Sequence, residues 1–137
     1  DSLIPNSSIH HRNSALLSVT KVEAEEELPS SYFDEQLADT YRRLKMPKGL
    51  LERLAGISSR RAWSAESSFE HGAAQAGCAA LAEAGIQPEQ IGLIINTSVT
   101  RDNFEPAVAV GIHHEIGLPR HALNFDMTNA CLGFVNG

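Results

Sequence analysis

The chain has 137 residues, of which 42% are apolar and 20% charged, and this composition fits one globular domain of about 150 residues. Seventeen acidic and eleven basic residues give a net charge of −6, which offers no basic footprint for nucleic acid or an anionic membrane. The apolar runs are too short for a transmembrane helix, and two cysteines do not make a disulfide framework. We therefore expect a cytoplasmic protein.

The N-terminal part of the chain is expected to be irregular before a first strand forms. Residues 1–13 are polar and show no periodicity, which predicts a flexible extension. Residues 14–22 (SALLSVTKV) are strand-like. The acidic run that follows, at 23–28, is typical of a solvated turn, because a block of like charge repels itself.

Helical signals begin after the acidic run. Ser31 and Asp34 form a start signal ahead of apolar residues at helical spacing. Residues 48–54 predict a second, short helix that ends at Gly56, where a residue without a side chain suits the turn. The next segment, 57–63 (ISSRRAW), predicts a short strand or an extended stretch.

A longer helix is predicted over residues 67–84. Ser67 and Glu70 form a capping box at its start, and Gly85 ends it. The helix is rich in alanine and glycine, which allow a neighbouring element to approach closely. We expect Cys78 to be an inert side chain among these small residues.

The C-terminal part alternates strands and helices. Residues 91–99 (IGLIINTSV) form a continuous apolar run, which predicts a strand buried on both faces. A helix over 107–116, a strand over 122–128 and a further short helix after Cys131 follow. Such an alternation is typical of an α/β fold with a parallel sheet.

Cys131 stands where the last strand gives way to small residues and to that short helix. The start of a helix favours a thiolate, and its free N–H groups can hold an oxyanion when a thioester is attacked. Buried cysteines are also common at strand ends. The pattern alone therefore leaves open whether Cys131 is a nucleophile or a structural residue.

The segment FDMTNACLGFVNG, at 125–137, resembles the nucleophile segment of the thiolase superfamily, in the branch of 3-oxoacyl-acyl-carrier-protein synthase III. Other segments agree in order and spacing, namely AGISSRRAW, AGIQPEQIGLIINTSVT and EPAVA. The resemblance covers residues 14–137. It implies that they form the N-terminal half-domain of an α/β, thiolase-like fold, with a mixed or parallel sheet and packed helices, and that Cys131 carries the acyl group.

Glu105 departs from the usual synthase III pattern, which has an aromatic residue before this proline. A carboxylate 26 residues before the nucleophile is similar to the arrangement in the head-to-head acyl-CoA condensing enzymes of bacterial olefin biosynthesis. Hydroxymethylglutaryl-CoA synthase also pairs a glutamate with a cysteine. These reactions need a base, because no decarboxylation generates the carbanion. The alternative is that Glu105 caps a helix that begins at Pro106, where a carboxylate suits the helix dipole.

The resemblance thus implies an acyltransferase that joins two fatty acyl-CoA molecules by Claisen condensation without decarboxylation, on the route to olefins or β-lactones. Cys131 would carry one acyl group and Glu105 would remove an α-proton from the second substrate. A decarboxylating synthase III acting on acyl-carrier-protein substrates, a hydroxymethylglutaryl-CoA synthase-like enzyme and a non-catalytic partner subunit are the alternatives. In the olefin-type relatives the glutamate reaches into the neighbouring subunit, which implies a dimer. No metal or redox cofactor is implied.

Members of the family are more than twice as long, and their catalytic His and Asn come from the C-terminal half. We therefore expect residues 14–137 to be one part of a longer or split enzyme that is inactive without its C-terminal half or a complementary chain. An apolar face of the sheet should then be uncovered. Arg60 and Arg61 either contact a CoA phosphate or form ion pairs, and Asp126 and Asn129 are expected to make strand-end hydrogen bonds.

Overall fold

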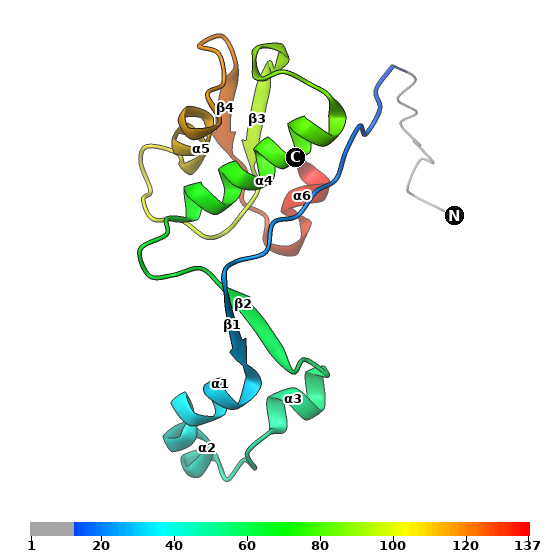
Figure 1. The fold of residues 1–137 in the computed structure, drawn as a ribbon. Coiled ribbons are helices and arrows are strands. Elements are labelled where there is room, and N and C mark those ends of the chain that lie inside the picture. Colours follow the sequence, from blue (N-terminus) through cyan, green and yellow to red (C-terminus); the bar gives the residue numbers. More distant parts are fainter. Residues whose placement is uncertain (1–12) are drawn as a thin grey trace, which may run out of the picture.

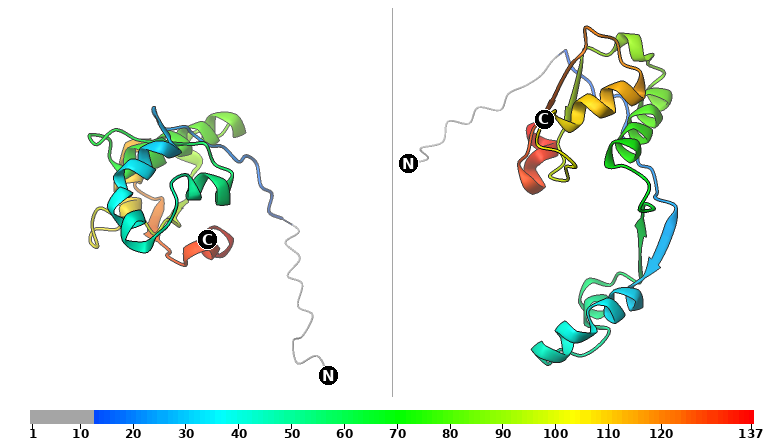
Figure 2. Two further views of the ribbon diagram at one scale, coloured as in Figure 1. Left: turned by 90° about the horizontal axis from the view of Figure 1, so that it is seen from below. Right: turned by 90° about the vertical axis from the view of Figure 1, so that its left-hand side faces the viewer.

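The computed structural model describes residues 13–137, so nearly all of the predicted flexible extension, residues 1–13, lies outside the described residues. A helical arm and an α/β layer make up the rest (Figure 1). Figure 2 shows the arm standing away from the layer, at the far end of a two-stranded ribbon. Within residues 13–137, no helix has both the length and the apolar character that crossing a membrane requires.

The ribbon consists of β1 (Glu26–Pro29) and β2 (Ser59–Ala62), which pair antiparallel with Glu27 opposite Arg61. The strand predicted within 57–63 is confirmed. The turn predicted for the acidic run is wrong, because half of that run forms β1, in which Glu27 faces Arg61 across the ribbon. Cross-strand pairs of opposite charge stabilise a sheet, whereas an unpaired acidic run would repel itself.

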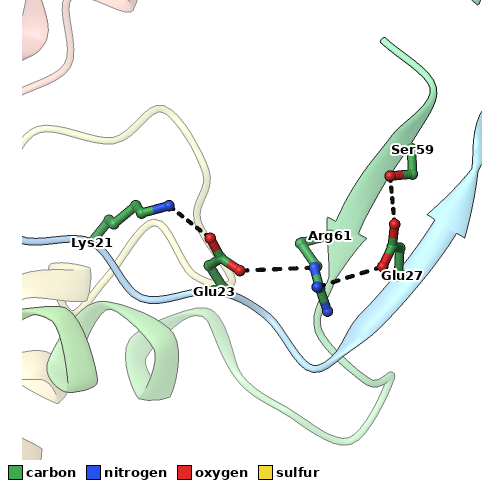
Figure 3. Close-up of polar contacts among 5 residues, drawn as sticks. All are labelled: Lys21, Glu23, Glu27, Ser59 and Arg61. Atoms are coloured by element: carbon green, nitrogen blue, oxygen red, sulfur yellow. Dashed lines mark hydrogen bonds and ion pairs between the residues drawn. The ribbon is translucent and has the colours of Figure 1, made fainter.

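One arginine joins the ribbon to the segment that leads into it (Figure 3). The Arg61 guanidinium lies 3.5 Å from the Glu27 carboxylate and 4.0 Å from that of Glu23, which also accepts a hydrogen bond from Lys21 over 2.6 Å. The hydrogen bond from Lys21, then the positive charges of Lys21 and Arg61, lower the pKa of Glu23. Ser59 donates to Glu27 over 2.7 Å. Each exposed pair contributes little to stability by itself, because water screens the two charges.

The segment predicted as a strand at 14–22 is extended but pairs with no strand, so that prediction is wrong. It lies along the helix α4 (Phe69–Ala84) instead. The Ser18 hydroxyl donates to the carbonyl of Ala80 over 2.9 Å, and the Thr20 hydroxyl donates to that of Ala76 over 3.1 Å. Hydroxyl side chains can bond to backbone groups in this way in place of a strand ladder.

The arm contains three short helices, α1 (Ser30–Gln36), α2 (Ala38–Leu44) and α3 (Leu50–Ala55). The first predicted helix is therefore two helices with a break at Leu37. The start signal is also wrong, because Pro29 precedes α1 and Asp34 accepts the N–H of Gly49 over 2.8 Å. The second predicted helix, ended by Gly56 in the left-handed region at φ 67°, is confirmed as α3.

The α/β layer is built on two parallel strands, β3 (Leu93–Asn96) and β4 (Leu123–Asp126), in the register Leu93 to Leu123. The helices α4 and α5 (Val108–Ile116) cover one face of this sheet. The predicted parallel α/β arrangement is thus confirmed. Two 3₁₀ turns, at Pro88–Gln90 and Ala130–Leu132, and a last helix α6 (Gly133–Asn136) complete the layer.

The core of the layer lies between α4, α5 and β3. Ala74, Val108 and Ile112 form its buried centre, with four half-buried apolar residues around them: Phe69, Ala73, Ile94 and Ile116. Gly77 brings the two helices close together, because a Cβ at this position would lie 2.6 Å from Ile116 Cδ1. Burial of the apolar faces of α4 and α5 is the main source of stability for this layer.

Two details of α4 differ from expectation. Ser68, not Ser67, caps the helix, and its hydroxyl accepts the N–H of His71 over 3.1 Å. Cys78, expected among the small residues that allow close approach, is instead exposed. A helix turns by about 100° per residue, which rotates Cys78 away from the contact that Gly77 makes with α5.

The second face of the sheet is uncovered in the described residues. Leu93, Leu123 and Phe125 alternate along the strands onto this face and are 45%, 67% and 40% exposed. The prediction that 91–99 is buried on both faces is therefore wrong, whereas the expected uncovered apolar face is present. An exposed apolar face of this kind is typical of an interaction surface.

Candidate functional site

Cys131 lies in the turn that follows β4. The turn is a short 3₁₀ segment, Ala130–Leu132, in which Leu132 donates its N–H to the carbonyl of Asn129 over 2.9 Å, and α6 follows as predicted. Ala130 has a φ of 41°, which is uncommon for a residue with a side chain. Such a conformation costs about 1–3 kcal/mol and is found mostly at functional sites.

The turn is held against the end of β3 by close packing. A Cβ on Gly133 would lie 2.5 Å from the carbonyl oxygen of Thr97, so glycine alone allows this approach. Met127 also donates its N–H to the carbonyl of Asn96 over 2.8 Å. These two contacts fix the position of Cys131 beside the carboxyl end of β3, where parallel α/β sheets place their ligand sites.

The Cys131 thiol is exposed and borders an open hollow of about 440 Å³. The end of β3 supplies polar groups next to the thiol, through Asn96, Thr97 and Ser98. The remaining walls are apolar and come from β3, α4, α5, Ala130 and α6, namely Ala73, Ala76, Gly77, Ile94, Ile95, Ile112, Ile116, Ala130 and Phe134. A thiol at the polar end of an apolar hollow suits a ligand with a polar head and a hydrocarbon chain.

Glu105 lies elsewhere on the surface, in the loop 97–107 that connects β3 to α5. Its side chain is exposed, makes no hydrogen bond or ion pair with another described residue, and is not among the residues that line the Cys131 hollow. The peptide bond between Glu105 and Pro106 is cis, and the neighbouring Phe104 is 90% exposed. Within one chain, the structure therefore does not bring the two predicted catalytic residues into one pocket.

The alternative role of Glu105 as a helix cap is wrong, because α5 begins at Val108 and Asp126 caps it. The Asp126 carboxylate accepts the N–H groups of Val108 and Ala109, each over 2.9 Å, and the side-chain N–H of Asn96 over 3.0 Å. The strand-end hydrogen bonds expected for Asp126 are thus confirmed. Asn129 also bonds, to the side chain of Asn136.

Several donors hold the Asp126 carboxylate in its charged form. Partial burial by itself raises the pKa of this group, but the hydrogen bonds from Ala109, Asn96 and Val108 and the charge of Arg101 together lower it below its ordinary value. The Arg101 guanidinium donates in turn to the hydroxyl of Thr128, between Asp126 and Cys131. The sequence gives no signal for the capping contact, because its donors lie 17 and 18 residues away from Asp126.

The two arginines of β2 are engaged within the chain. Arg61 forms the ion pairs described above, so the ion-paired alternative holds for it. Arg60 lies over the Phe33 ring, 5.5 Å from its centre, and donates to the Ser30 hydroxyl over 3.2 Å. A contact of either residue with a CoA phosphate stays a prediction. Among residues 13–137, no three His, Cys, Asp or Glu side chains form a group that could hold a metal ion.

Comparison with known proteins identifies relatives along most of the chain, although no family model matches it. The acyl-CoA:acyl-CoA alkyltransferase of Xanthomonas campestris is 39% identical over 126 residues, which are 92% of this chain and 37% of that protein. The beta-ketoacyl-[acyl-carrier-protein] synthase III of Bradyrhizobium diazoefficiens is 36% identical over 109 residues, which are 77% of this chain and 33% of that protein.

Solved structures of related proteins support the same relationship. The crystal structure of OleA from Xanthomonas campestris with cerulenin bound superposes with a TM-score of 0.77 at 41% identity, over 85% of this chain and 34% of that one. The predicted thiolase-like fold is thereby confirmed. The chain spans about a third of the length of the relatives that it matches.

Proposed function

Because this chain belongs to the thiolase superfamily and is homologous to acyl-CoA:acyl-CoA alkyltransferases and to synthases III, we propose that it carries the nucleophile and the base of a condensing enzyme. The nucleophile is Cys131 and the base is Glu105. The enzyme joins two fatty acyl-CoA molecules without decarboxylation. The observation that carries the proposal is the position of Cys131, whose exposed thiol borders an apolar hollow directly after β4.

In the first step the Cys131 thiolate attacks the carbonyl carbon of one acyl-CoA. A new carbon–sulfur bond forms, the bond to the CoA sulfur breaks, and CoA leaves as its thiolate. The acyl group is then a thioester on Cys131, which divides one difficult condensation into two easier reactions. The apolar walls of the hollow, among them Ile112 and Phe134, are suited to shield the hydrocarbon chain.

In the second step the Glu105 carboxylate takes an α-proton from a second acyl-CoA. The resulting carbanion attacks the carbonyl carbon of the acyl-Cys131 thioester, and the cysteine leaves again as a thiolate. The product is a β-ketoacyl-CoA, and the proton on Glu105 passes to solvent. The exposed Glu105 side chain makes no hydrogen bond with another described residue, so a substrate can reach its carboxylate.

Two further surfaces complete the site. We place the C-terminal part of the enzyme, or a complementary chain, on the uncovered sheet face that Leu93, Leu123 and Phe125 form. A second copy of this chain brings its Glu105 to the Cys131 hollow, which explains why the two residues lie apart within one chain. The reaction takes place in the cytoplasm, because Cys131 must remain a reduced thiol to be acylated.

The test is mass spectrometry of the intact, assembled enzyme after incubation with a long-chain acyl-CoA alone. We expect an adduct of one acyl group on Cys131, followed by β-ketoacyl-CoA in solution. A non-catalytic partner subunit of this fold would gain no adduct, and that result would refute the proposal. The peptide that contains Cys131 should carry the adduct, and the exposed Cys78 provides an internal control for non-specific acylation.

A second candidate is a decarboxylating synthase III, which the 36% identity to such an enzyme favours. This enzyme would also form acyl-Cys131, so the adduct does not distinguish the two. Its carbanion would come from loss of CO₂ from a malonyl thioester, and no base would be needed. Formation of β-keto product from acyl-CoA alone supports the first function. A strict requirement for a malonyl thioester, with release of CO₂, supports the second.

A further inference from the structure

Asp126 joins the loop that carries Glu105 to the strand that leads to Cys131. Its carboxylate accepts the N–H groups of Val108 and Ala109, the first two residues of α5, each over 2.9 Å. Glu105 precedes the first of these donors by three residues, and Cys131 follows Asp126 by five. A single carboxylate therefore fixes the end of the Glu105 loop relative to the path of the nucleophile.

The same carboxylate is fixed from the start of the loop. Asn96, which is 8% exposed, donates to Asp126 over 3.0 Å, and its own side-chain oxygen accepts the N–H of Ser98 over 3.2 Å. Both ends of the loop 97–107 are thus tied to Asp126, directly at α5 and through Asn96 at β3. The exposed Glu105 makes no side-chain hydrogen bond with another described residue, so its position depends on how its loop is held, at both ends by Asp126 and in between by the contact of Arg101 with Thr128.

The Cys131 turn has supports that do not involve this carboxylate. Gly133 packs against the Thr97 carbonyl, and Leu132 donates to the Asn129 carbonyl over 2.9 Å. The backbone N–H of Met127 donates to the Asn96 carbonyl over 2.8 Å. Loss of the Asp126 carboxylate should consequently disturb the α5 end of the loop, which carries Glu105, more than its β3 end, against which the Cys131 turn packs.

We propose that Asp126 is a positioning residue for Glu105, which holds the loop 97–107 at the start of α5 so that the Glu105 carboxylate meets the α-carbon of the second substrate. This inference rests on the proposed role of Glu105 as the base. Asp126 touches no substrate and acts through the loop. Its signature is a split between the two half-reactions, in which condensation is impaired and acylation of Cys131 is not.

The experiment is a double-mutant cycle in the assembled enzyme, with the two half-reactions measured separately. Asp126→Asn replaces one acceptor oxygen by an amide that can only donate, so one N–H of α5 loses its partner. We expect condensation to fall about 100-fold, the cost of a displacement of about 1 Å at a reacting group, while acylation stays within the same order of magnitude. Glu105→Gln should lower condensation by about 10²- to 10⁴-fold. The double variant should be no slower than Glu105→Gln, because a residue that acts only through Glu105 has nothing left to position.

The outcomes separate the two proposals. If Glu105→Gln leaves condensation unchanged, Glu105 is not the base and the proposed function fails. If Glu105→Gln abolishes condensation but Asp126→Asn slows both half-reactions equally, or the two effects multiply in the double variant, the positioning role fails and the base assignment stands. Each condensation rate is divided by the amount of protein that Cys131 acylation titrates, so a reduced folded fraction does not imitate the effect.

A matched pair at Val108 tests the same hydrogen bond from the donor side, should Asp126→Asn fail to fold. Val108→Pro deletes the N–H that Asp126 accepts. Proline suits the first residue of a helix. The preceding Ala107, at φ −54° and ψ 141°, already has the extended conformation that a residue before proline requires. Val108→Ala removes more of the buried side chain but keeps the N–H. A lower ratio of condensation to acylation in Val108→Pro than in Val108→Ala supports the inference, and equal ratios overturn it.

Discussion

Gly133→Ala tests how tightly the turn that holds Cys131 is packed. The Cβ of an alanine would lie 2.5 Å from the Thr97 carbonyl oxygen, whereas ordinary contacts begin at 3.4 Å, so the turn or β3 must move by nearly 1 Å. The atom it meets belongs to the backbone of Thr97, the residue directly after β3, and cannot swing aside. Two effects therefore oppose each other, because Gly133 has helical dihedral angles at which alanine is favoured by about 0.5–1 kcal/mol. Overpacking costs about 1–3 kcal/mol, and we expect it to prevail.

The assay measures thermal unfolding of the assembled enzyme and the rate of Cys131 acylation by an acyl-CoA. A displacement of about 1 Å at a reacting group is worth about 100-fold in rate, so acylation should fall by about that factor and unfolding should occur at a lower temperature. Gly92→Ala is the matched control, since its Cβ would meet no atom within 4 Å. Parent-like acylation in Gly133→Ala would refute the close packing of the turn on β3.

Two further predictions concern the nucleophile and the response to acid. Cys131→Ser should abolish the acyl adduct while Cys78→Ser leaves it, because an alcohol without a dedicated base is a poor nucleophile at neutral pH; equal losses would mean that both changes act through the structure. The pKa of Asp126 is lowered in the folded state from 3.8, so its contribution to stability is complete above that value and is lost as the pH falls through the folded-state pKa. Unfolding temperatures measured from pH 6 to pH 3 should therefore fall less in Asp126→Asn than in the parent.

The elements that could be predicted from the sequence are those with local signals. The apolar run before Asn96 and the run before Asp126 correspond to β3 and β4, and glycines in the left-handed region end α3 and α4 as expected, at φ 67° and 66°. Such a glycine has a physical role that does not depend on the rest of the chain, since it alone enters this conformation at little cost. The resemblance of the segment around Cys131 to the thiolase superfamily then predicted the fold as a whole.

The elements that could not be predicted depend on distant partners. The acidic run forms β1 because Arg61, more than thirty residues later in the sequence, faces it across the ribbon. The cap of α5 comes from Asp126 on the following strand, and no signal next to the helix reveals it. Cys78 lies in a helix of small residues, yet the short α5 covers only part of that helix. Local sequence patterns cannot reveal which distant charge pairs with an acidic run, which residue caps a helix, or which element covers a helix face.

The separation of Glu105 from the Cys131 hollow leads to a last prediction, which concerns two copies of the chain. If Glu105 serves the site of a second copy, a mixed dimer of Cys131→Ser and Glu105→Gln chains contains one site with both an intact thiol and an intact carboxylate. Each variant alone has no such site. Equal mixing and reassociation should therefore restore condensation to about a quarter of the parent rate, because half of the dimers are mixed and one of their two sites is complete.

Acylation in the same mixture serves as a control for folding. Acylation needs only Cys131, so it should proceed at half the parent capacity whether or not the subunits exchange, which verifies that the Glu105→Gln chain is folded. A control mixture, in which the Cys131→Ser chain also carries Glu105→Gln, measures the residual activity. If Glu105 instead acted on the thiol of its own chain, every site would lack one of the two groups and mixing would restore nothing. The exposed position of Glu105, outside the hollow that Cys131 borders, favours restoration.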